Sequence, residues 1–182
     1  MKFNDTHLKD VVVIEPTVFG DERGFFMETW NADTFRKAGL DVPFLQDNHS
    51  RSARGILRGL HFQTEQTQGK LVRVSSGEVF DVAVDLRRSS PTLGQWFGVT
   101  LNASNNKMLW VPPGFAHGFY VISEFADFQY KCTDLYHPAS EICLAWDDPT
   151  VAIEWPATAG DAPQLSAKDS AGLCWEDLPL FD

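Results

Sequence analysis

Apolar and polar positions alternate most clearly between Glu78 and Leu86, with the two-residue period of a β-strand. One face of this segment carries Phe80, Val82, Val84 and Leu86, and the other carries Val79, Asp81, Ala83 and Asp85. Short runs rich in β-branched and aromatic residues recur along the chain, broken by Gly, Pro, Asn and Ser. They predict further strands over Val11–Ile14, Gly24–Trp30, Ile56–Phe62, Lys70–Val74, Trp96–Leu101, Met108–Val111, Gly118–Val121, Phe125–Thr133 and Ile142–Trp146.

One short helix is expected over Asn31–Ala38, with Asn31 as its N-cap and Gly39 as its stop. Many short strands separated by turn residues favour a mainly β protein, an antiparallel sandwich or barrel with few short helices. No linker or repeat divides the chain, so residues 1–182 are expected to form a single domain. The segment from about 157 to 182 has weak strand character and is expected to wrap around the barrel.

Composition and charge narrow the classes of function. The chain has 182 residues, a net charge of −10 and a pI near 4.8, which argues against nucleic-acid binding. The stretch from Arg51 to Arg73 runs against this balance, with five basic residues and one acid, so it is a candidate anion site. Neither a signal peptide nor a membrane-spanning run is visible, and three cysteines without CxxC spacing are expected to be reduced thiols. These features favour a cytoplasmic protein.

Two of the five histidines lie in unusual surroundings. His61 shares a predicted strand with Arg58 and Gly59, and His117 follows a rigid Pro-Pro-Gly turn. Imidazole titrates near neutral pH and suits proton transfer, although a lone histidine is more often structural. A metal site is the rival interpretation. A metal-binding cupin would use a His-x-His pair, whereas this chain has His61-x-Gln63 and no well-placed carboxylate, so we expect no metal.

Other positions add chemistry to this stretch of strands. Lys70 begins a strand whose face is otherwise apolar, and a lone buried charge must be paired or must serve a site. Tyr130 lies in the middle of a strand, where a half-buried core role is the more common outcome for a lone tyrosine and a catalytic role is the alternative. From the residues alone, these positions and Asp169 cannot be joined into one site.

In combination, these motifs resemble the dTDP-4-dehydrorhamnose 3,5-epimerase family over nearly the whole chain. The resemblance rests on several segments in order: residues 21–26 (DERGFF), 46–50 (QDNHS), 57–63 (LRGLHFQ), 69–74 (GKLVRV), 81–87 (DVAVDLR), 90–92 (SPT), 113–119 (PGFAHGF), 130–131 (YK) and 165–169 (LSAKD). It implies a cupin-like jelly-roll barrel that works without a metal or other cofactor. It also implies a homodimer in which a strand crosses the interface.

The resemblance assigns roles to matching residues. His61 would be the general base, oriented by Asp169; Tyr130 would be the acid on the opposite face, and Lys70 would stabilise the enolate. The expected contacts with a dTDP-linked 4-keto sugar are Arg23, Phe26, Glu28, Gln46, Asp47, Asn48, Arg58, His117, Glu141 and Lys168. The implied reaction is inversion of C3 and C5 on the way to L-rhamnose. Alternatives are an epimerase for one centre, a metal-dependent cupin, and a binding module without catalysis.

One geometric problem stays open at this point. Arg58 and His61 are separated by an odd number of residues, so a regular strand would point them to opposite faces. Gly59 would allow a β-bulge that re-aims one of them. Alternatively, Arg58 would meet a ligand that reaches in from a strand edge or from the partner subunit.

Overall fold

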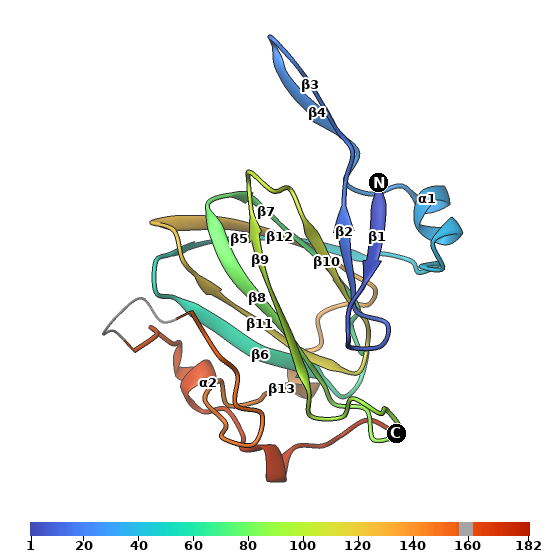
Figure 1. The fold of residues 1–182 in the computed structure, drawn as a ribbon. Helices are drawn as coiled ribbons and strands as arrows, with labels where there is room; N and C mark the ends of the chain where they lie inside the picture. Colours follow the sequence, from blue (N-terminus) through green and yellow to red (C-terminus); the bar gives the residue numbers. More distant parts are fainter. Residues whose placement is uncertain (157–161) are drawn as a thin grey trace.

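The computed structural model describes residues 1–156 and 162–182, and its strands form two antiparallel sheets that face each other (Figure 1). The first sheet has the order β1 (Lys2–Asp5), β2 (Val12–Glu15), β10 (Met108–Val111), β7 (Lys70–Ser76), β12 (Phe125–Cys132), β5 (Gln46–Ala53). The second has the order β13 (Glu141–Cys143), β6 (Leu57–Gln63), β11 (Phe115–Val121), β8 (Glu78–Asp85), β9 (Trp96–Asn102). The mainly β, cupin-like barrel predicted from the sequence is confirmed.

Apolar side chains fill the space between the sheets and cover both outer faces. The interior cluster includes Val72, Val79, Leu109 and Phe128. A second cluster lies on the outer face of the five-stranded sheet, where Val82, Val84 and Leu86 pack against residues of the C-terminal third. Both faces of β8 are therefore buried, and the face carrying Asp81 and Ala83 is the one that points inward. This arrangement places the carboxylate of Asp81 inside the barrel, fully buried.

Helix α1 (Ala32–Lys37) covers part of the outer face of the six-stranded sheet, through Phe35. Its N-cap is the predicted one, since the side chain of Asn31 accepts a hydrogen bond from the backbone of Thr34. Helix α2 (Ala167–Ser170) lies beside β6, and 3-10 turns occupy Pro138–Ser140 and Trp175–Asp177. No helix among the described residues is long and apolar enough to cross a membrane.

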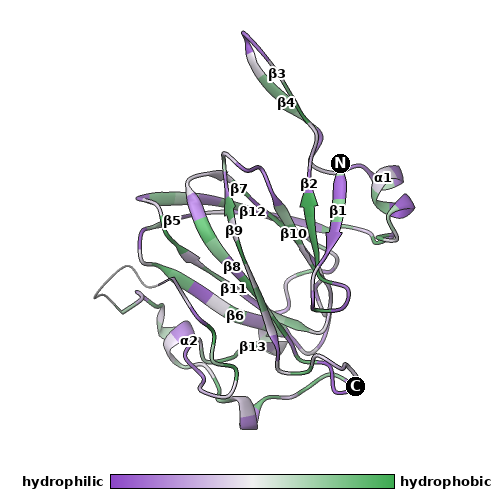
Figure 2. Ribbon diagram, in the orientation of Figure 1, coloured by the Kyte–Doolittle hydropathy of each residue, from purple (hydrophilic) through white to green (hydrophobic). Residues whose placement is uncertain are grey.

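Strands β3 (Val18–Asp21) and β4 (Gly24–Met27) form a hairpin that stands away from the barrel (Figure 1), here called the hairpin arm. Figure 2 shows that this projecting arm carries hydrophobic residues as well as polar ones. Phe19, Phe25 and Phe26 are 63%, 66% and 69% exposed. The strand predicted over 24–30 is shorter in the structure, because β4 pairs only with β3 and this pairing ends at Met27.

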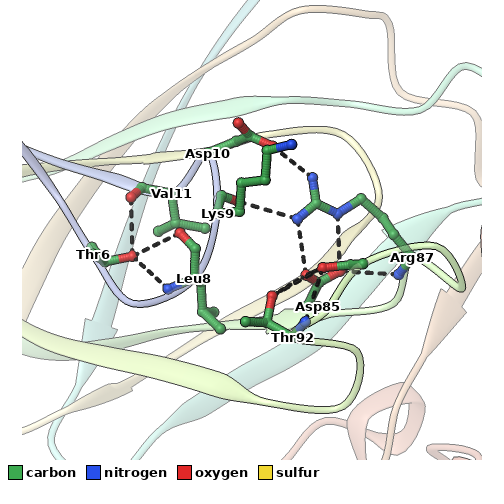
Figure 3. Close-up of polar contacts among 9 residues, drawn as sticks. Thr6, Leu8, Lys9, Asp10, Val11, Asp85, Arg87 and Thr92 are labelled. Carbon is green, nitrogen blue, oxygen red and sulfur yellow. Dashed lines mark hydrogen bonds and ion pairs between the residues drawn. The ribbon is translucent and has the colours of Figure 1, made fainter.

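The loop between β1 and β2 is tied to the barrel by a network of polar contacts around Asp85 (Figure 3). The carboxylate of Asp85 accepts hydrogen bonds from Arg87, Ser90 and Thr92, and Arg87 also reaches the carboxylate of Asp10 at 2.9 Å. These donors hold the pKa of Asp85 below its usual value, although burial alone would raise it.

The remaining strand boundaries differ from expectation in a few places. Strand β11 begins three residues before the predicted Gly118, and β13 ends at Cys143 rather than Trp146. Strands β1, β3 and β5 were not predicted, and in β5 the inward side chains are polar. Beyond residue 161, the chain meets the barrel through isolated bridges at Gln164, Leu173 and Phe181. Residues 157–161 of the segment expected to wrap the barrel lie outside the described residues.

Candidate active site

A cavity of about 690 Å³ opens between the two sheets, and polar side chains from both of them line it. Strands β6 and β11 contribute Arg58, His61 and His117 from one wall. Strands β5, β7 and β12 contribute the opposite wall with Gln46, Asn48, Lys70 and Tyr130. Glu141 at the start of β13, together with Ser166, Lys168 and Asp169 around α2, completes the lining.

His61 and Asp169 meet in this cavity although they are far apart in the sequence. Nε2 of His61 lies 2.7 Å from Oδ1 of Asp169. The same oxygen accepts a hydrogen bond from the backbone of Gly59, and the other oxygen accepts one from Oγ of Ser166 at 2.6 Å. Burial opposes ionisation of Asp169, but His61, Ser166 and Gly59 outweigh it and hold the pKa of this carboxyl well below its usual range.

Helix α2 positions that carboxylate through a capping box. Ser166 is the N-cap and accepts from the backbone of Asp169, while the side chain of Asp169 reaches back to Ser166. The side chain of Asp169 is therefore fixed by local sequence before it contacts His61. An ionised carboxylate at this point fixes the orientation of the imidazole and stabilises its protonated form.

A β-bulge in β6 explains how Arg58 and His61 can face the same cavity although they are three residues apart. His61 lies opposite His117, whereas Arg58 lies opposite Phe119, so β6 has one residue more than β11 over this stretch. Gly59 has φ +128°, and a Cβ there would lie 2.6 Å from Cα of Gly118, so this position requires glycine. Arg58 and His61 consequently line the same cavity, and Oγ of buried Ser52 holds Nε of Arg58 at 2.9 Å.

Lys70 and Tyr130 lie across the cavity from the sheet that carries His61. Nζ of Lys70 is 3.5 Å from the backbone oxygen of His61, and burial lowers the pKa of this lysine. The nearby charges of Glu141 and Asp81 act in the opposite direction. Burial raises the pKa of Tyr130, so its phenol is protonated at neutral pH.

Glu141 links the loop before β13 to α2. Its Oε2 accepts a hydrogen bond from the hydroxyl of Tyr136 at 2.6 Å and forms an ion pair with Lys168. Burial would raise the pKa of Glu141, but Lys168 and Tyr136 lower it overall. The hydrogen bond with Glu141 in turn raises the pKa of Tyr136 to about 12.

Four of the predicted ligand residues lie outside the cavity within one chain. Asp47 is on the opposite face of β5 and pairs with Lys131 at 2.9 Å. Arg23 and Phe26 belong to the hairpin arm, where Arg23 pairs with Asp21, and Glu28 accepts from the side chain of Asn31. Strand alternation explains Asp47, because Gln46 and Asn48 take the two inward positions around it.

Four residues that contact the site residues were not predicted from the sequence: Asp81, Tyr136, Ser52 and Ser166. Asp81 was detectable, because a carboxylate on an apolar strand needs a partner just as Lys70 does; that partner is His117, at 3.0 Å. Ser166, three residues before Asp169, is a recognisable N-cap signal. Tyr136 and Ser52 carry no comparable signal, since one lies in a loop and the other in the polar strand β5.

The sequence of this chain is similar to those of known epimerases over nearly its full length. The sequence profile of dTDP-4-dehydrorhamnose 3,5-epimerase matches residues 5–177. The chain is 56% identical to the dTDP-4-dehydrorhamnose 3,5-epimerase of Pseudomonas aeruginosa, over 100% of this chain and 99% of the relative.

Two solved structures show how far the similarity of the fold extends. The dTDP-6-deoxy-D-glucose-3,5-epimerase of Legionella pneumophila, in complex with dTDP-4-keto-L-rhamnose, superposes with a TM-score of 0.94 at 52% identity, covering 98% of this chain and 94% of that one. A 3'-monoepimerase from Streptomyces bikiniensis, in complex with dTDP-quinovose, gives 0.86 at 32% identity, covering 93% and 85%. The profile match and the full-length identity decide the matter: this chain belongs to the dTDP-4-dehydrorhamnose 3,5-epimerase family.

Proposed function

We propose that the protein epimerises dTDP-4-dehydro-6-deoxy-D-glucose at C3 and C5 to dTDP-4-dehydro-L-rhamnose, as a step in dTDP-L-rhamnose biosynthesis. One observation carries this proposal: His61 and Tyr130 come from opposite sheets and line the same cavity. Inversion of a carbon requires that a proton leaves one face and another arrives at the opposite face. Two proton carriers on opposite walls meet that requirement.

The proposed reaction moves protons to and from a carbon next to the ketone and passes through an enolate. His61 takes the proton from the carbon next to the C4 ketone, and the electron pair moves onto the ketone oxygen to give an enolate. The ammonium of Lys70 stabilises that oxygen, and such a contribution is typically about 10²–10³-fold in rate. Tyr130 then protonates the carbon from the other face and recovers its proton from solvent, while His61 releases to solvent the proton that it took. Because Nε2 of His61 faces Asp169, Nδ1 is the ring nitrogen assigned to the exchange.

The remaining lining residues would bind the nucleotide sugar. Arg58 offers its terminal guanidinium nitrogens to the diphosphate, since Nε donates to Ser52. Gln46, Asn48, His117, Glu141 and Lys168 supply polar contacts from the cavity wall, and Asp47 would contribute through its backbone. No metal or other cofactor has a part in this mechanism.

The hairpin arm supports a homodimer as part of the proposal. Its exposed phenylalanines need a cover, and Arg23, Phe26 and Glu28 lie on or just after it, outside the cavity of their own chain. In a homodimer the arm would reach the cavity of the second copy and bring these residues to the dTDP group. We place the enzyme in the cytoplasm, where its three free cysteines would stay reduced.

Activity in D₂O tests the reaction. The purified protein is supplied with dTDP-4-dehydro-6-deoxy-D-glucose, and deuterium at each sugar carbon is followed by NMR. We expect incorporation at both C3 and C5, with His61→Asn as the inactive control. Incorporation at one carbon alone would establish the alternative, a single-centre epimerase acting on a related dTDP-4-keto deoxysugar. A protein that binds dTDP without exchange at either carbon would be a binding module.

Mixed dimers test the shared site. Co-expressed His61→Asn and Arg23→Ala chains form heterodimers in which one site combines wild-type His61 with wild-type Arg23. If the arm acts across the interface, purified heterodimers should regain about half of the wild-type activity. If Arg23 acts within its own chain, both sites stay defective and no activity returns.

A further inference from the structure

Behind His61 lies a group of three side chains that the reaction does not use as a set. Cys143 on β13 is directly opposite His61 on β6, so in this antiparallel pair their side chains are on the same face. Asp169 reaches the same point from α2. One ligand atom from each residue, a ring nitrogen of His61, Sγ of Cys143 and an oxygen of Asp169, lies within 4.8 Å of the other two.

The donor set is the kind that a thiophilic divalent cation takes. Zinc binds imidazole nitrogen, thiolate sulfur and carboxylate oxygen, and three protein ligands with a fourth open position are typical of accessible sites. Around a tetrahedral zinc, the ligand atoms are separated by roughly 3.3–3.8 Å. The 2.7 Å contact between His61 and Asp169 would have to widen slightly, while the sulfur would have to move inward.

The state of the histidine supports the same interpretation. Nε2 of His61 is buried and lies 2.7 Å from Oδ1 of Asp169. A divalent cation between these two atoms would replace the proton that they share. Cys143 is buried as well, and its Sγ donates to the backbone oxygen of Leu144 over a long distance of 3.5 Å.

We propose that His61, Cys143 and Asp169 bind a zinc-type divalent cation, and that the bound cation switches the enzyme off. Binding displaces the thiol proton of Cys143, which passes to solvent, and the neutral imidazole of His61 then carries its single proton on Nδ1 instead of Nε2. The carboxylate and the thiolate then balance the two charges of the ion. The cation would occupy Nε2 of His61 and pull Asp169 away from its orienting position. The binding site stands on its own, whereas the inhibition rests on the proposed function.

This site differs from the metal centre of a metal-binding cupin. That arrangement needs a second histidine two residues after the first, a position that Gln63 holds here. In this chain the further ligands come from β13 and α2, which are distant in the sequence. The cation is accordingly an inhibitor in our proposal and has no part in turnover.

Binding is tested on the metal-free protein by calorimetry with Zn²⁺ and by absorbance with Co²⁺. We expect one ion per chain and a sulfur-to-cobalt charge-transfer band in the near ultraviolet. Cys143→Ser should weaken binding at least tenfold and remove the band, and Cys143→Ala serves as a second variant if the serine chain folds poorly. The matched control is Cys174→Ser, which changes an exposed cysteine elsewhere and should leave both signals intact. Equal binding by wild type and Cys143→Ser would overturn the proposal.

Inhibition is measured in parallel on the same proteins. Zn²⁺ should inhibit the wild-type enzyme, EDTA should restore it, and Cys143→Ser should need at least tenfold more Zn²⁺ for half inhibition. Zinc binding through Cys143 in a protein without epimerase activity would keep the site and refute the proposed function. An active enzyme that neither binds nor responds to zinc through Cys143 would refute the site alone.

Discussion

Two histidines from adjacent strands line the cavity, and each pairs with an aspartate whose pKa is shifted in the opposite direction from that of the other. His61 and His117 are direct neighbours across the β6–β11 pairing. His117 meets Asp81, with Nε2 at 3.0 Å and 3.1 Å from the two carboxylate oxygens. Burial raises the pKa of Asp81, and the attraction of His117 and Lys70 does not overcome it.

Asp169 is almost as deeply buried, with 4% of its surface exposed, yet its pKa is lowered. The difference lies in the additional donors, because the helix cap at Ser166 and the backbone of Gly59 bind the carboxylate besides His61. The comparison teaches that a histidine alone does not offset the effect of burial on the pKa of a carboxyl group, whereas a histidine together with a helix cap and a backbone donor does. We expect the His61 pair to serve proton transfer and the His117 pair to hold the substrate and the barrel.

The largest expected effect separates the two histidines. His61→Asn should reduce kcat by about 10³-fold, within the range that general base catalysis contributes. His117→Asn should raise KM while kcat changes by less than about tenfold, because in our proposal His117 binds substrate and takes no proton. Steady-state kinetics with melting curves as a folding control measure both. Similar losses of kcat in the two variants would erase the distinction.

The aspartates should follow the same division at a smaller scale. Asp169→Asn removes the charge that stabilises the protonated His61, so we expect kcat to fall about 10²-fold. Asp81→Asn keeps the size of a side chain that takes no part in the proposed proton transfer, and kcat should fall less than about tenfold. A loss of kcat in Asp81→Asn as large as that in Asp169→Asn would show that both histidine–aspartate pairs act in the chemistry.

Stability should depend on pH with opposite signs at the two aspartates. Asp169 has a lowered pKa, so its contribution to stability is present above the unfolded value of about 3.9 and is lost as pH falls through the folded value. Asp81 has a raised pKa, so its contribution is present below about 3.9 and is lost as pH rises through the folded value.

Melting curves at two pH values measure this contrast. Asp169→Asn should cost more stability at pH 7 than at pH 3.5, and Asp81→Asn should cost more at pH 3.5 than at pH 7. One pKa unit corresponds to about 1.4 kcal/mol, or roughly 3–5 °C for a chain of this size. The same pH trend in both variants would contradict the assignment.

The smallest effect concerns the donors that distinguish Asp169. Ser166→Ala removes the N-cap of α2 and the hydrogen bond from Oγ to the carboxylate, at a cost of about 1 kcal/mol. Ser170→Ala in the same helix removes only an exposed hydroxyl contact and should stay within about 0.5 kcal/mol. Thermal melting compares the two variants. Equal changes in Tm would show that Ser166 does not contribute to the stabilisation of Asp169.

Strands could be predicted from the sequence where apolar residues occupy their inward face. Strand β5 escaped prediction, because Gln46, Asn48 and Ser50 point into a polar cavity and produce no apolar alternation. The problem of Arg58 and His61 arose from assuming a regular strand, and only the pairing with β11 shows that β6 bulges at Gly59.

By itself, the sequence determined the β-rich barrel, the helix cap at Asn31 and the residue types needed for proton transfer, because these follow from local periodicity and side-chain chemistry. Only the tertiary structure decided which of those residues meet. His61, Lys70, Tyr130 and Asp169 come from three strands and a helix, and their distances depend on how the sheets pack. The opposite pKa shifts of Asp81 and Asp169 were likewise decided by the tertiary structure, because burial and the number of nearby donors are properties of the folded chain.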